Sequence, residues 1–592
     1  MNESAILHIP DSQYCFAVGE KKLVIRLRMA KEDADASVTL IYAGKYQFQQ
    51  SREQIPMEIR YTDRLYHYYE TTLVLTDVRL AYVFCIRQQG TTYYFCEDGV
   101  VLQYDFAEGF YNFFQMPYIN RNDVLPTVKW MKSAVFYQIF VDRFFCGNTK
   151  KDRSYINMEW GALPTPKSFA GGDLCGIIEK LDYLKDLGIT AIYLTPIFRS
   201  ISNHKYDTMD YMQIDPQFGT KEEFGELVRM AHAHGIRIVL DAVFNHCSMQ
   251  MQQFCDVMEK GAESPYYDWF LIDGAYPVPS RANYECFAEC TYMPKLDTAN
   301  REVQEYLIGI ACYWIREYGI DGWRLDVSDE VSHVFWRRFR EAVKKEKADA
   351  VIIGENWHDA YPYLRGDQYD SIMNYAFTKA CLDYFARKTF DAKQMAEKLS
   401  SNLMRNMEPV NRMMLNLLDS HDTHRFYSEV GENPDRLLAA LALEMVFPGA
   451  PCIYYGTEIC TPGGYDPDSR RCFDWEKVHT DTDVRKKLTE LTHIRSCTAI
   501  TDGNVELAAE NGMLCVRRKA GGEGVSLYIN MTEEQRRQEH CLKADSKVLS
   551  AHRASVLPAA GDGKMTCGVC VEPEGYLIVR EQREALDCYG RK

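Results

Sequence analysis

Residues 322–327 read GWRLDV, a short and mainly apolar run that carries Arg324 and Asp326, and residues 351–356 read VIIGEN, a second such run that carries Glu355. Runs this short and this continuously apolar are typical of strands buried on both faces of a parallel sheet. Amphipathic segments that suit helices separate most such runs, for example VQEYLIGIACYWIREYG at 303–319. The pattern therefore predicts a parallel sheet covered by helices.

Eight runs of this kind follow one another in the middle of the chain. Eight strand–helix units over about 370 residues predict a closed (β/α)8 barrel, a TIM barrel of the α/β class. A doubly wound open sheet is the alternative, but its first strand should lead into a glycine-rich phosphate-binding loop, and VFYQIFVDRF has none. The predicted strands are VFYQIFV (135–141), AIYLTP (191–196), IRIVLDAVF (236–244), GWRLDV (322–327), VIIGEN (351–356), SIMNYAF (371–377), MLNLLDSH (414–421) and CIYYGTE (452–458).

The sequence on either side of the barrel reads as short strands, such as KLVIRLRM near the N-terminus and GVSLYINMT near the C-terminus. Short strands separated by charged or glycine-containing turns are typical of β-sandwiches. The gap between the third and fourth barrel strands is long enough for a small inserted domain. We therefore expect an N-terminal β-sandwich at 1–120, a linker at 121–132, the barrel at 133–500 with an inserted domain at about 247–300, and a C-terminal β-sandwich at 501–592.

The chain of 592 residues carries 68 lysines and arginines against 84 aspartates and glutamates, a net charge of −16. This acidic balance argues against nucleic acid or an anionic membrane as the main partner. The first residues, MNESAILHIPDSQY, contain neither a basic segment nor a long apolar one, so we expect no targeting signal. The most apolar run, 437–447, is too short to cross a bilayer.

Twenty cysteines are scattered along the chain without a repeated spacing. The close pair Cys567 and Cys570 lacks the second pair that would complete a zinc site. Reduced thiols in a cytoplasmic protein are the simpler interpretation.

Carboxylates stand where several of the predicted strands end. In a barrel of this kind the chemistry lies at the carboxyl ends of the strands. Converging carboxylates without a basic phosphate clamp suit glycoside hydrolysis, in which one carboxylate attacks the anomeric carbon and a second, protonated, gives its proton to the leaving oxygen. The polar residues at these ends are Asp241, Asn245, His246, Arg324, Asp326, Glu355, Asp419, His421 and Asp422.

Arg324 lies two residues before Asp326, so both side chains point to the same face of their strand. A guanidinium there would keep Asp326 ionised, as a nucleophile requires. Glu355 has no cation beside it in the sequence, and nearby carboxylates would favour its protonated form, which suits an acid. We expect Asp241 to be a buried partner of Arg324. A divalent metal is the rival use of three carboxylates, and Arg324 disfavours it.

Four stretches, DAVFNH (241–246), GWRLD (322–326), GEN (354–356) and LLDSHD (417–422), resemble in order and spacing the signature regions of the α-amylase family, glycoside hydrolase family 13. The resemblance implies a retaining double displacement at an α-glucosidic bond. By position, Asp326 matches the nucleophile, Glu355 the general acid/base and Asp422 the transition-state stabiliser. Residues that match sugar-binding or positioning residues are His246, Arg324, His421 and, as the aromatic platform, Tyr206.

MPKL at 293–296 resembles the MPKLN motif of the neopullulanase, cyclomaltodextrinase and maltogenic amylase subgroup, although Asp297 stands in place of the asparagine. VSDE at 327–330 is similar to the subgroup's VANE. The subgroup has an N-terminal, carbohydrate-binding-like domain that forms homodimers, in which the partner's domain narrows the cleft. The resemblance therefore implies that cyclodextrins and short maltooligosaccharides are favoured over long starch chains.

The resemblance also implies further substrate-binding residues. Phe287 and Trp357 offer flat rings of the kind that stack on glucose, and simple packing is the alternative for each. Asp466 and Arg470, in GGYDPDSRR, resemble a loop that holds the non-reducing side of the substrate.

Some relatives bind calcium with a loop after the first strand and a GGD segment. Asn148, Asp152, Gly171 and Asp173 stand at the matching places, but Cys146 and Lys151 occupy positions where oxygen ligands are usual. The resemblance leaves a structural calcium open, and it requires no cofactor for the reaction.

We therefore expect a retaining hydrolase of α-1,4 and some α-1,6 glucosidic bonds in cyclodextrins, maltooligosaccharides and pullulan, with some transglycosylation. An oligo-1,6-glucosidase or a mainly transferring enzyme is the alternative. A non-catalytic glucan-binding protein is a remote one, because such proteins usually lack one of the three carboxylates, and Asp326, Glu355 and Asp422 are all present.

Overall fold

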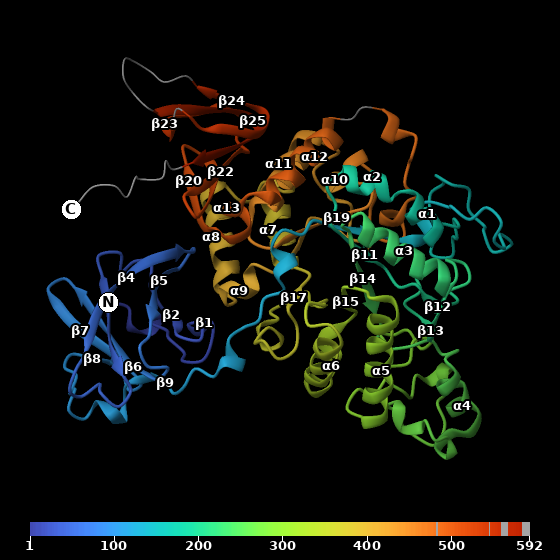
Figure 1. The fold of residues 1–592 in the computed structure, drawn as a ribbon, viewed down its shortest axis with the longest axis horizontal. Helices are drawn as coiled ribbons and strands as arrows, with labels where there is room; N and C mark the ends of the chain where they lie inside the picture. Colours follow the sequence, from blue (N-terminus) through green and yellow to red (C-terminus); the bar gives the residue numbers. More distant parts are fainter. Residues whose placement is uncertain (481–482, 544, 558–565, 583–592) are drawn as a thin grey trace. The chain divides into compact units, whose positions relative to one another are not determined.

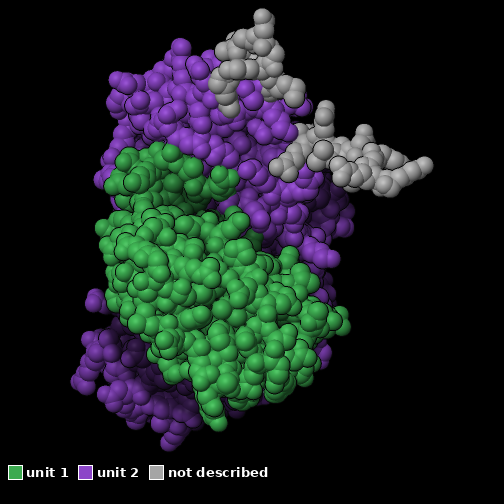
Figure 2. All heavy atoms as spheres, turned by 90° about the vertical axis from the view of Figure 1, so that its left-hand side faces the viewer, with its two compact units in different colours: residues 1–127, 390–411, 506–509 green, residues 128–389, 412–505, 510–592 purple. Residues whose placement is uncertain are grey.

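The fold comes from a computed structural model that describes residues 1–480, 483–543, 545–557 and 566–582 (Figure 1). Among the described residues, every helix is too short or too polar to span a bilayer. The chain divides into two compact units, drawn in green and purple in Figure 2. The first contains 1–127, 390–411 and 506–509, and the second contains 128–389, 412–505 and 510–592.

The N-terminal part of the first unit is an antiparallel β-sandwich, as predicted. Alternation along β2 and β3 turns Leu23, Leu27 and Leu40 into one core, where they meet Phe84 of β6. The strands pair in the order β1-β2-β5-β4-β3-β6-β7-β8, with β9 on β6. They are β1 Cys15–Gly19, β2 Lys22–Ala30, β3 Ser37–Gly44, β4 Glu53–Thr62, β5 Tyr66–Val74, β6 Leu80–Gln88, β7 Thr91–Cys96, β8 Gly99–Val101 and β9 Phe114–Met116.

Helix α8, Ala392–Met404, belongs to this first unit, although its sequence position lies between two barrel strands. A capping box at Asp391 starts the helix. Lys31 Nζ lies 2.5 Å from Glu397 Oε1, and Arg26 donates a hydrogen bond of 3.2 Å to the Asn406 carbonyl. The apolar pattern of the sequence did not predict this association.

The second unit contains the predicted (β/α)8 barrel (Figure 1). Its parallel strands pair in the order β17-β16-β15-β14-β11-β10-β19-β18. A parallel bridge between Met373 and Leu415 joins the two ends of this path, and the Asn374 amide donates a hydrogen bond of 2.8 Å to the Leu415 carbonyl, so the barrel is closed. The strands are β10 Phe136–Ile139, β11 Ala191–Leu194, β14 Arg237–Ala242, β15 Gly322–Leu325, β16 Val351–Gly354, β17 Ser371–Ile372, β18 Leu415–Leu417 and β19 Ala450–Tyr454.

The barrel interior is filled by residues from the beginnings of the strands, including Phe136, Val351 and Ala450. Val128 and Met131, which the sequence assigned to a linker, are buried in the same core. The end of the expected linker thus packs against the barrel interior.

Most of the predicted alternation of strands and helices is present. The sixth strand differs, because the predicted run 371–377 contains a strand only over Ser371–Ile372. The Asn374 side chain accepts the Phe377 amide and starts α7, Tyr375–Cys381. The other principal helices of this unit are α1 Leu174–Glu179, α2 Leu181–Asp186, α3 Lys221–Ala233, α5 Arg301–Tyr318, α6 His333–Glu346, α11 Pro434–Val446 and α12 Asp483–His493.

Two additions to the barrel were also predicted. The inserted domain follows β14 and contains α4, Gln252–Lys260, and short bridges such as Cys286–Pro294. The C-terminal β-domain is an antiparallel sheet whose longest strand, β25, pairs with three others. Its strands are β20 Asn504–Glu510, β21 Met513–Ala520, β22 Glu523–Asn530, β23 Arg536–Lys543, β24 Lys547–Leu557 and β25 Thr566–Gln582.

Candidate active site

Asp326, Glu355 and Asp422 line one cavity of about 560 Å³. They follow strands β15, β16 and β18, which are far apart in the sequence but share one rim of the barrel. Asp326 and Glu355 are 5% and 7% exposed, so both are nearly desolvated and still reach the cavity. The other lining residues are His204, Tyr206, His246, Phe287, Cys290, Tyr292, Met293, Val327, Asp329, Trp357, Tyr465, Asp466 and Arg470.

The buried Arg324 guanidinium holds three carboxyl groups together. Arg324 Nη1 lies 2.7 Å from Asp326 Oδ1 and 3.1 Å from Asp241 Oδ1, and Nη2 lies 2.8 Å from Glu355 Oε2. Asp241 is the register partner of Arg324 across the parallel pair β14 and β15, so the sheet itself places it there. The prediction that Asp241 is a buried partner of Arg324 is confirmed.

The contact between Arg324 and Glu355 corrects one expectation. In the sequence Glu355 has no neighbouring cation, but β16 pairs with β15 and brings Glu355 to the second terminal nitrogen of the guanidinium. Asp326 and Glu355 therefore cannot be distinguished by which of them has a cation partner.

The charges in this cluster do not balance, because one guanidinium faces three acids. Burial raises the pKa of Asp241 to about 6. Burial also raises the pKa of Asp326 well above its ordinary value, while Arg324 opposes that rise and the charge of Glu355 adds to it. These shifts favour a proton on the cluster at pH values where an ordinary carboxyl group is already ionised.

The backbone directly after β15 adopts an unusual conformation that places an amide against Glu355. Val327 has φ of +44°, a left-handed conformation that a β-branched residue rarely adopts. In this conformation its amide donates a hydrogen bond of 3.0 Å to Glu355 Oε2. Trp357 Nε1 donates to the other oxygen, Oε1, at 3.2 Å. Both carboxyl oxygens of Glu355 are thus held in place.

Trp357 and Gly354 complete the loop after β16. The Trp357 ring stacks on Tyr375 at 3.8 Å with an interplanar angle of 6°, and 46% of the residue is exposed. A Cβ at Gly354 would lie 2.6 Å from the Tyr369 ring and 2.9 Å from Ser328 Oγ, so only glycine fits there.

Asp422 is more open than the other two acids, and a second arginine holds it. Arg470 Nη2 donates to Asp422 Oδ1 at 3.1 Å, Nε donates to the His421 carbonyl at 2.8 Å, and Nη1 lies 3.4 Å from Asp466 Oδ2. Asp466 lies on the cavity wall. The structure thus brings Asp466 and Arg470 to the site, where Arg470 orients Asp422.

His421 connects Asp422 with Tyr206, the residue expected to be the aromatic platform. Gln138 Nε2 donates to His421 Nδ1 at 2.7 Å, which assigns the ring proton to Nε2, 3.1 Å from Asp422 Oδ2. The His421 ring stacks on Tyr206 at 5.4 Å, and the Tyr206 hydroxyl contacts both His421 Nε2 and Asp241 Oδ2. Burial lowers the pKa of His421 well below its ordinary value, so the ring is neutral.

His246 and Phe287 form another part of the cavity wall. Their rings stack at 4.8 Å, and His246 Nε2 lies 4.0 Å from Asp326 Oδ2. Burial and the charge of Lys295 lower the pKa of His246 to about 3. Within the described residues, His246 Nε2 has no hydrogen-bond partner, so this nitrogen is available to a group in the cavity.

Several residues of the site were missed from the sequence. His204 lines the cavity, Tyr193 donates to Asp241 Oδ2 at 2.7 Å, and Tyr375 supports Trp357. Gln138 carried a usable signal, because it is a lone amide inside the apolar run VFYQIFV. His204 stands in the polar stretch HKYD (204–207), two residues before Tyr206, and its place there was a usable signal as well. Tyr193 and Tyr375 lie in apolar runs without a polar motif.

Residues 138–499 match the alpha-amylase catalytic domain, and residues 1–120 match the alpha-amylase N-terminal Ig-like domain. The chain belongs to the α-amylase family. It is accordingly a glycoside hydrolase.

Two relatives and one solved structure show how far the likeness extends. The chain is 42% identical over 548 residues to the cyclomaltodextrinase of Thermoanaerobacter pseudethanolicus, covering 90% of this chain and 93% of the relative. It is 43% identical over 509 residues to neopullulanase 2 of Thermoactinomyces vulgaris, covering 85% and 86%. A solved cyclomaltodextrinase structure superimposes with a TM-score of 0.90 at 34% identity, covering 98% of this chain and all of that one.

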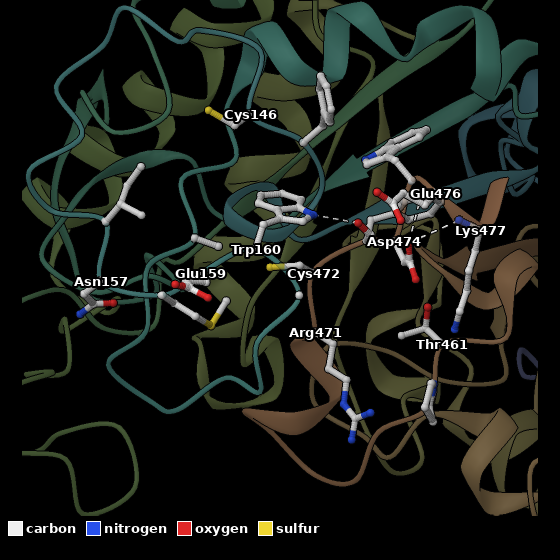
Figure 3. Close-up of a pocket in the computed structure, with 18 of the residues that line it drawn as sticks. Cys146, Asn157, Glu159, Trp160, Thr461, Arg471, Cys472, Asp474, Glu476 and Lys477 are labelled. Atoms are coloured by element: carbon white, nitrogen blue, oxygen red, sulfur yellow. Dashed lines mark hydrogen bonds between the residues drawn. The ribbon is translucent and has the colours of Figure 1, made fainter. Parts of the chain in front are cut away.

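A larger cavity, of about 1020 Å³, lies elsewhere on this α-amylase family member (Figure 3). Residues 145–161 form one part of its wall and residues 461–477 another, and none of the three catalytic candidates lines it. Trp160 Nε1 donates to the Phe473 carbonyl at 3.0 Å, which fixes the plane of this ring. Size alone therefore does not identify the site, since the smaller cavity holds the acids.

The residues expected to hold calcium do not fit a calcium ion. Lys151 Nζ lies 2.9 Å from Asp173 Oδ2 and 2.7 Å from the Gly171 carbonyl oxygen. Asp152 is exposed, and its carboxylate accepts hydrogen bonds from Ser154 instead. Within the described residues there is also no group of three or more His, Cys, Asp or Glu side chains suited to a metal.

Proposed function

We propose that this enzyme hydrolyses α-glucosidic bonds with retention of configuration, with Asp326 as nucleophile, Glu355 as acid/base and Asp422 as stabiliser of the sugar in the transition state. The observation that carries the proposal is the gathering of these three acids around one sugar-sized cavity. Asp326 and Glu355 bind adjacent nitrogens of one guanidinium, which favours the short separation of a retaining pair, about 5–5.5 Å between carboxyls.

In the first step an oxygen of Asp326 attacks the anomeric carbon, and the glycosidic bond breaks as Glu355 gives its proton to the leaving oxygen. In the second step water attacks the same carbon, Glu355 takes a proton from that water, and the bond to Asp326 breaks. The excess of acids over cations around Arg324 supports a proton in the cluster before the first step. The Arg324 hydrogen bond stabilises the charge on Asp326 before it attacks, and again when the ester bond to Asp326 breaks in the second step.

The neutral rings of the site suit a sugar. His246 lines the cavity, and His421 Nε2 contacts Asp422 and Tyr206, which also line it. Both rings are neutral, so neither adds a charge that would repel an oxocarbenium-like transition state. Tyr206 offers a flat face, and Arg470 fixes Asp422 so that its carboxylate can bind two hydroxyls.

For substrates we propose cyclodextrins, maltooligosaccharides and pullulan, cut at α-1,4 and some α-1,6 bonds, with some transglycosylation. The names of the relatives, a cyclomaltodextrinase and a neopullulanase, support this choice. Exposed rings at the site, Trp357 and Tyr465, add surfaces on which further glucose units can stack.

The test is hydrolysis of β-cyclodextrin by the wild-type protein and by Asp326→Asn. We expect maltose and glucose from the wild type and a loss of at least about 10³-fold in kcat for the variant, because the amide cannot form the glycosyl ester. An unchanged melting temperature shows that the variant is folded. A wild type that releases no sugar from β-cyclodextrin contradicts the substrate, and a fully active variant contradicts the nucleophile.

Product analysis on panose and pullulan separates the alternatives. Predominant cleavage of α-1,6 bonds would favour an oligo-1,6-glucosidase, and accumulation of longer products would favour a mainly transferring enzyme. All three enzymes would use Asp326 and Glu355 in the same way until the glycosyl-enzyme forms. The product pattern therefore tests only which bond is bound for cleavage and whether water or a second sugar accepts the glycosyl group.

We further propose a cytoplasmic homodimer formed through the N-terminal domain. The nineteen cysteines in the described residues are free thiols, which supports a reducing compartment. Tyr46, Phe110 and Tyr111 of the N-terminal domain are exposed by half or more, and exposed aromatics are typical of interfaces. Light scattering after gel filtration should give twice the chain mass, and a Tyr111→Ser, Phe110→Ser variant should shift it toward the monomer.

A further inference from the structure

Lys151 lies in a cage of three oxygen atoms next to the barrel. Its ammonium nitrogen is 2.7 Å from the Gly171 carbonyl oxygen, 2.8 Å from the Gln217 carbonyl oxygen and 2.9 Å from Asp173 Oδ2. The side chain is 8% exposed and that of Asp173 is 1% exposed. An ammonium has three N–H donors and no acceptor, so these three oxygens use its entire hydrogen-bonding capacity.

The oxygens of this cage are of the type that hard cations bind. Backbone carbonyls and a carboxylate are ordinary ligands of calcium, which takes six to eight of them at about 2.3–2.6 Å. Here the distances are those of charge-assisted hydrogen bonds. The charge also balances, because a single positive ammonium faces the single carboxylate of Asp173.

The cage connects three segments that are separate in the sequence. Asp173 also accepts the amides of Gly147 and Asn148, which secures the loop after β10. The Gln217 side chain accepts Lys205 Nζ, and Lys205 pairs with Asp215 at 3.0 Å. Lys205 directly precedes Tyr206, the platform of the proposed site. One cation thus secures the loop after β10 and the segment that ends in Gln217.

We propose that the Lys151 ammonium performs the structural work of a calcium ion in this chain, and that Lys151→Asn converts the same oxygens into a divalent-cation site. Asparagine supplies an amide oxygen, which a hard cation accepts as a ligand, in place of a cation that repels it. The proposal does not depend on the proposed reaction, because every contact that carries it lies outside the catalytic cluster.

The loop that Lys151 secures continues into the wall of the larger cavity. Asn157, Glu159 and Trp160 are labelled on that wall in Figure 3. Gly171 is fixed there as well, because its φ is +92° and a Cβ would lie 2.4 Å from Ile156 Cδ1. Loss of the cation should therefore loosen residues 147–161.

The experiment compares the wild type, Lys151→Asn and the control Lys150→Asn in thermal unfolding, first in a chelator and then in rising CaCl2. Lys150 is the adjacent lysine, is exposed, and leaves the cage intact. We expect the wild type and the control to melt within about 1 °C of one another in both conditions. Lys151→Asn should melt at least about 3 °C lower in the chelator and recover as calcium saturates.

Calorimetric titration with CaCl2 gives the second readout. We expect one calcium ion per chain for Lys151→Asn and none for the wild type. One calcium bound by the wild type, or a fall in its melting temperature in the chelator, would overturn the proposal. A folded Lys151→Asn that melts identically in chelator and calcium would overturn it as well. If Lys151→Asn fails to fold in both conditions, the titration of the wild type remains the test: calcium bound by the wild type contradicts the proposal, and no bound calcium agrees with it.

Discussion

Two buried cations of the second unit, Arg324 and Lys151, bind oxygen atoms in opposite ways. Arg324 faces three carboxyl groups, those of Asp241, Asp326 and Glu355, so its cluster holds more acid than it can neutralise. Lys151 faces one carboxylate and two backbone carbonyls, and its cluster is neutral. An unbalanced cluster binds and releases protons easily, whereas a balanced one only holds the chain in place. Both clusters are buried, so charge balance, more than burial, separates the reactive cluster from the structural one.

Among changes that leave the three proposed catalytic acids in place, the largest effect should come from replacing the guanidinium that holds them. Arg324→Lys keeps a positive charge, but one ammonium cannot span three carboxyls as the planar guanidinium does. We expect kcat/KM on β-cyclodextrin to fall by about 10²–10³-fold. The pKa of Asp326 should rise further without the guanidinium, so the acid limb of the pH profile should move to higher pH.

The matched change in the structural cluster is Lys151→Met, which should lower the melting temperature but leave kcat/KM within about threefold. Comparable losses of activity in Arg324→Lys and Lys151→Met would show that both clusters act only through the stability of the fold, and the distinction between them would be lost.

Asp241→Asn tests the excess of acid in the reactive cluster. Burial raises the pKa of Asp241 from 3.8 to about 6, so the folded protein binds this proton more tightly than the unfolded chain. Between these values the folded state holds more protons, and rising pH therefore lowers stability, by at most about 3 kcal/mol. We expect the wild type to lose more in melting temperature than Asp241→Asn between pH 4 and pH 6. Parallel curves would mean that Asp241 is ionised throughout this range.

The smallest effect is expected from replacing one exposed tryptophan in each of the two cavities. Trp357→Ala removes an exposed ring and the hydrogen bond to Glu355 Oε1, and kcat/KM should fall about tenfold. Trp160→Ala is the matched control, because Trp160 is similarly exposed, at 38% against 46%, but lines the larger cavity. We expect kcat/KM of Trp160→Ala on β-cyclodextrin to stay near the wild-type value. A larger loss for Trp160→Ala would place substrate binding in the larger cavity.

The sequence was sufficient where periodicity and strand order determine structure. Short apolar runs predicted the barrel, and topology alone brings the ends of β15, β16 and β18 to one rim, so Asp326, Glu355 and Asp422 could be grouped in advance. The pairing of Arg324 with Asp241 follows from the spacing of charges in neighbouring strands. The sixth strand was predicted too long, because the cap at Asn374 starts a helix inside an apolar run.

The sequence did not predict which side chains from different segments contact one another. The contact of Arg324 with Glu355 depends on how far the guanidinium reaches along the neighbouring strand, past its register partner Ile353, which the sequence spacing does not encode. The same holds for the three oxygens around Lys151, two of which are backbone carbonyls and carry no sequence signal. The inclusion of α8 in the first unit likewise depends on contacts such as Lys31 with Glu397.

The most direct test is to trap the glycosyl-enzyme. Glu355→Gln is incubated with an activated 5-fluoro-α-glucosyl fluoride, digested, and analysed by mass spectrometry. We predict one added sugar on the peptide that contains Asp326, and no label when Asp326 is replaced by Asn. A label on a different acid, or wild-type hydrolysis that yields the β-anomer first, would contradict it.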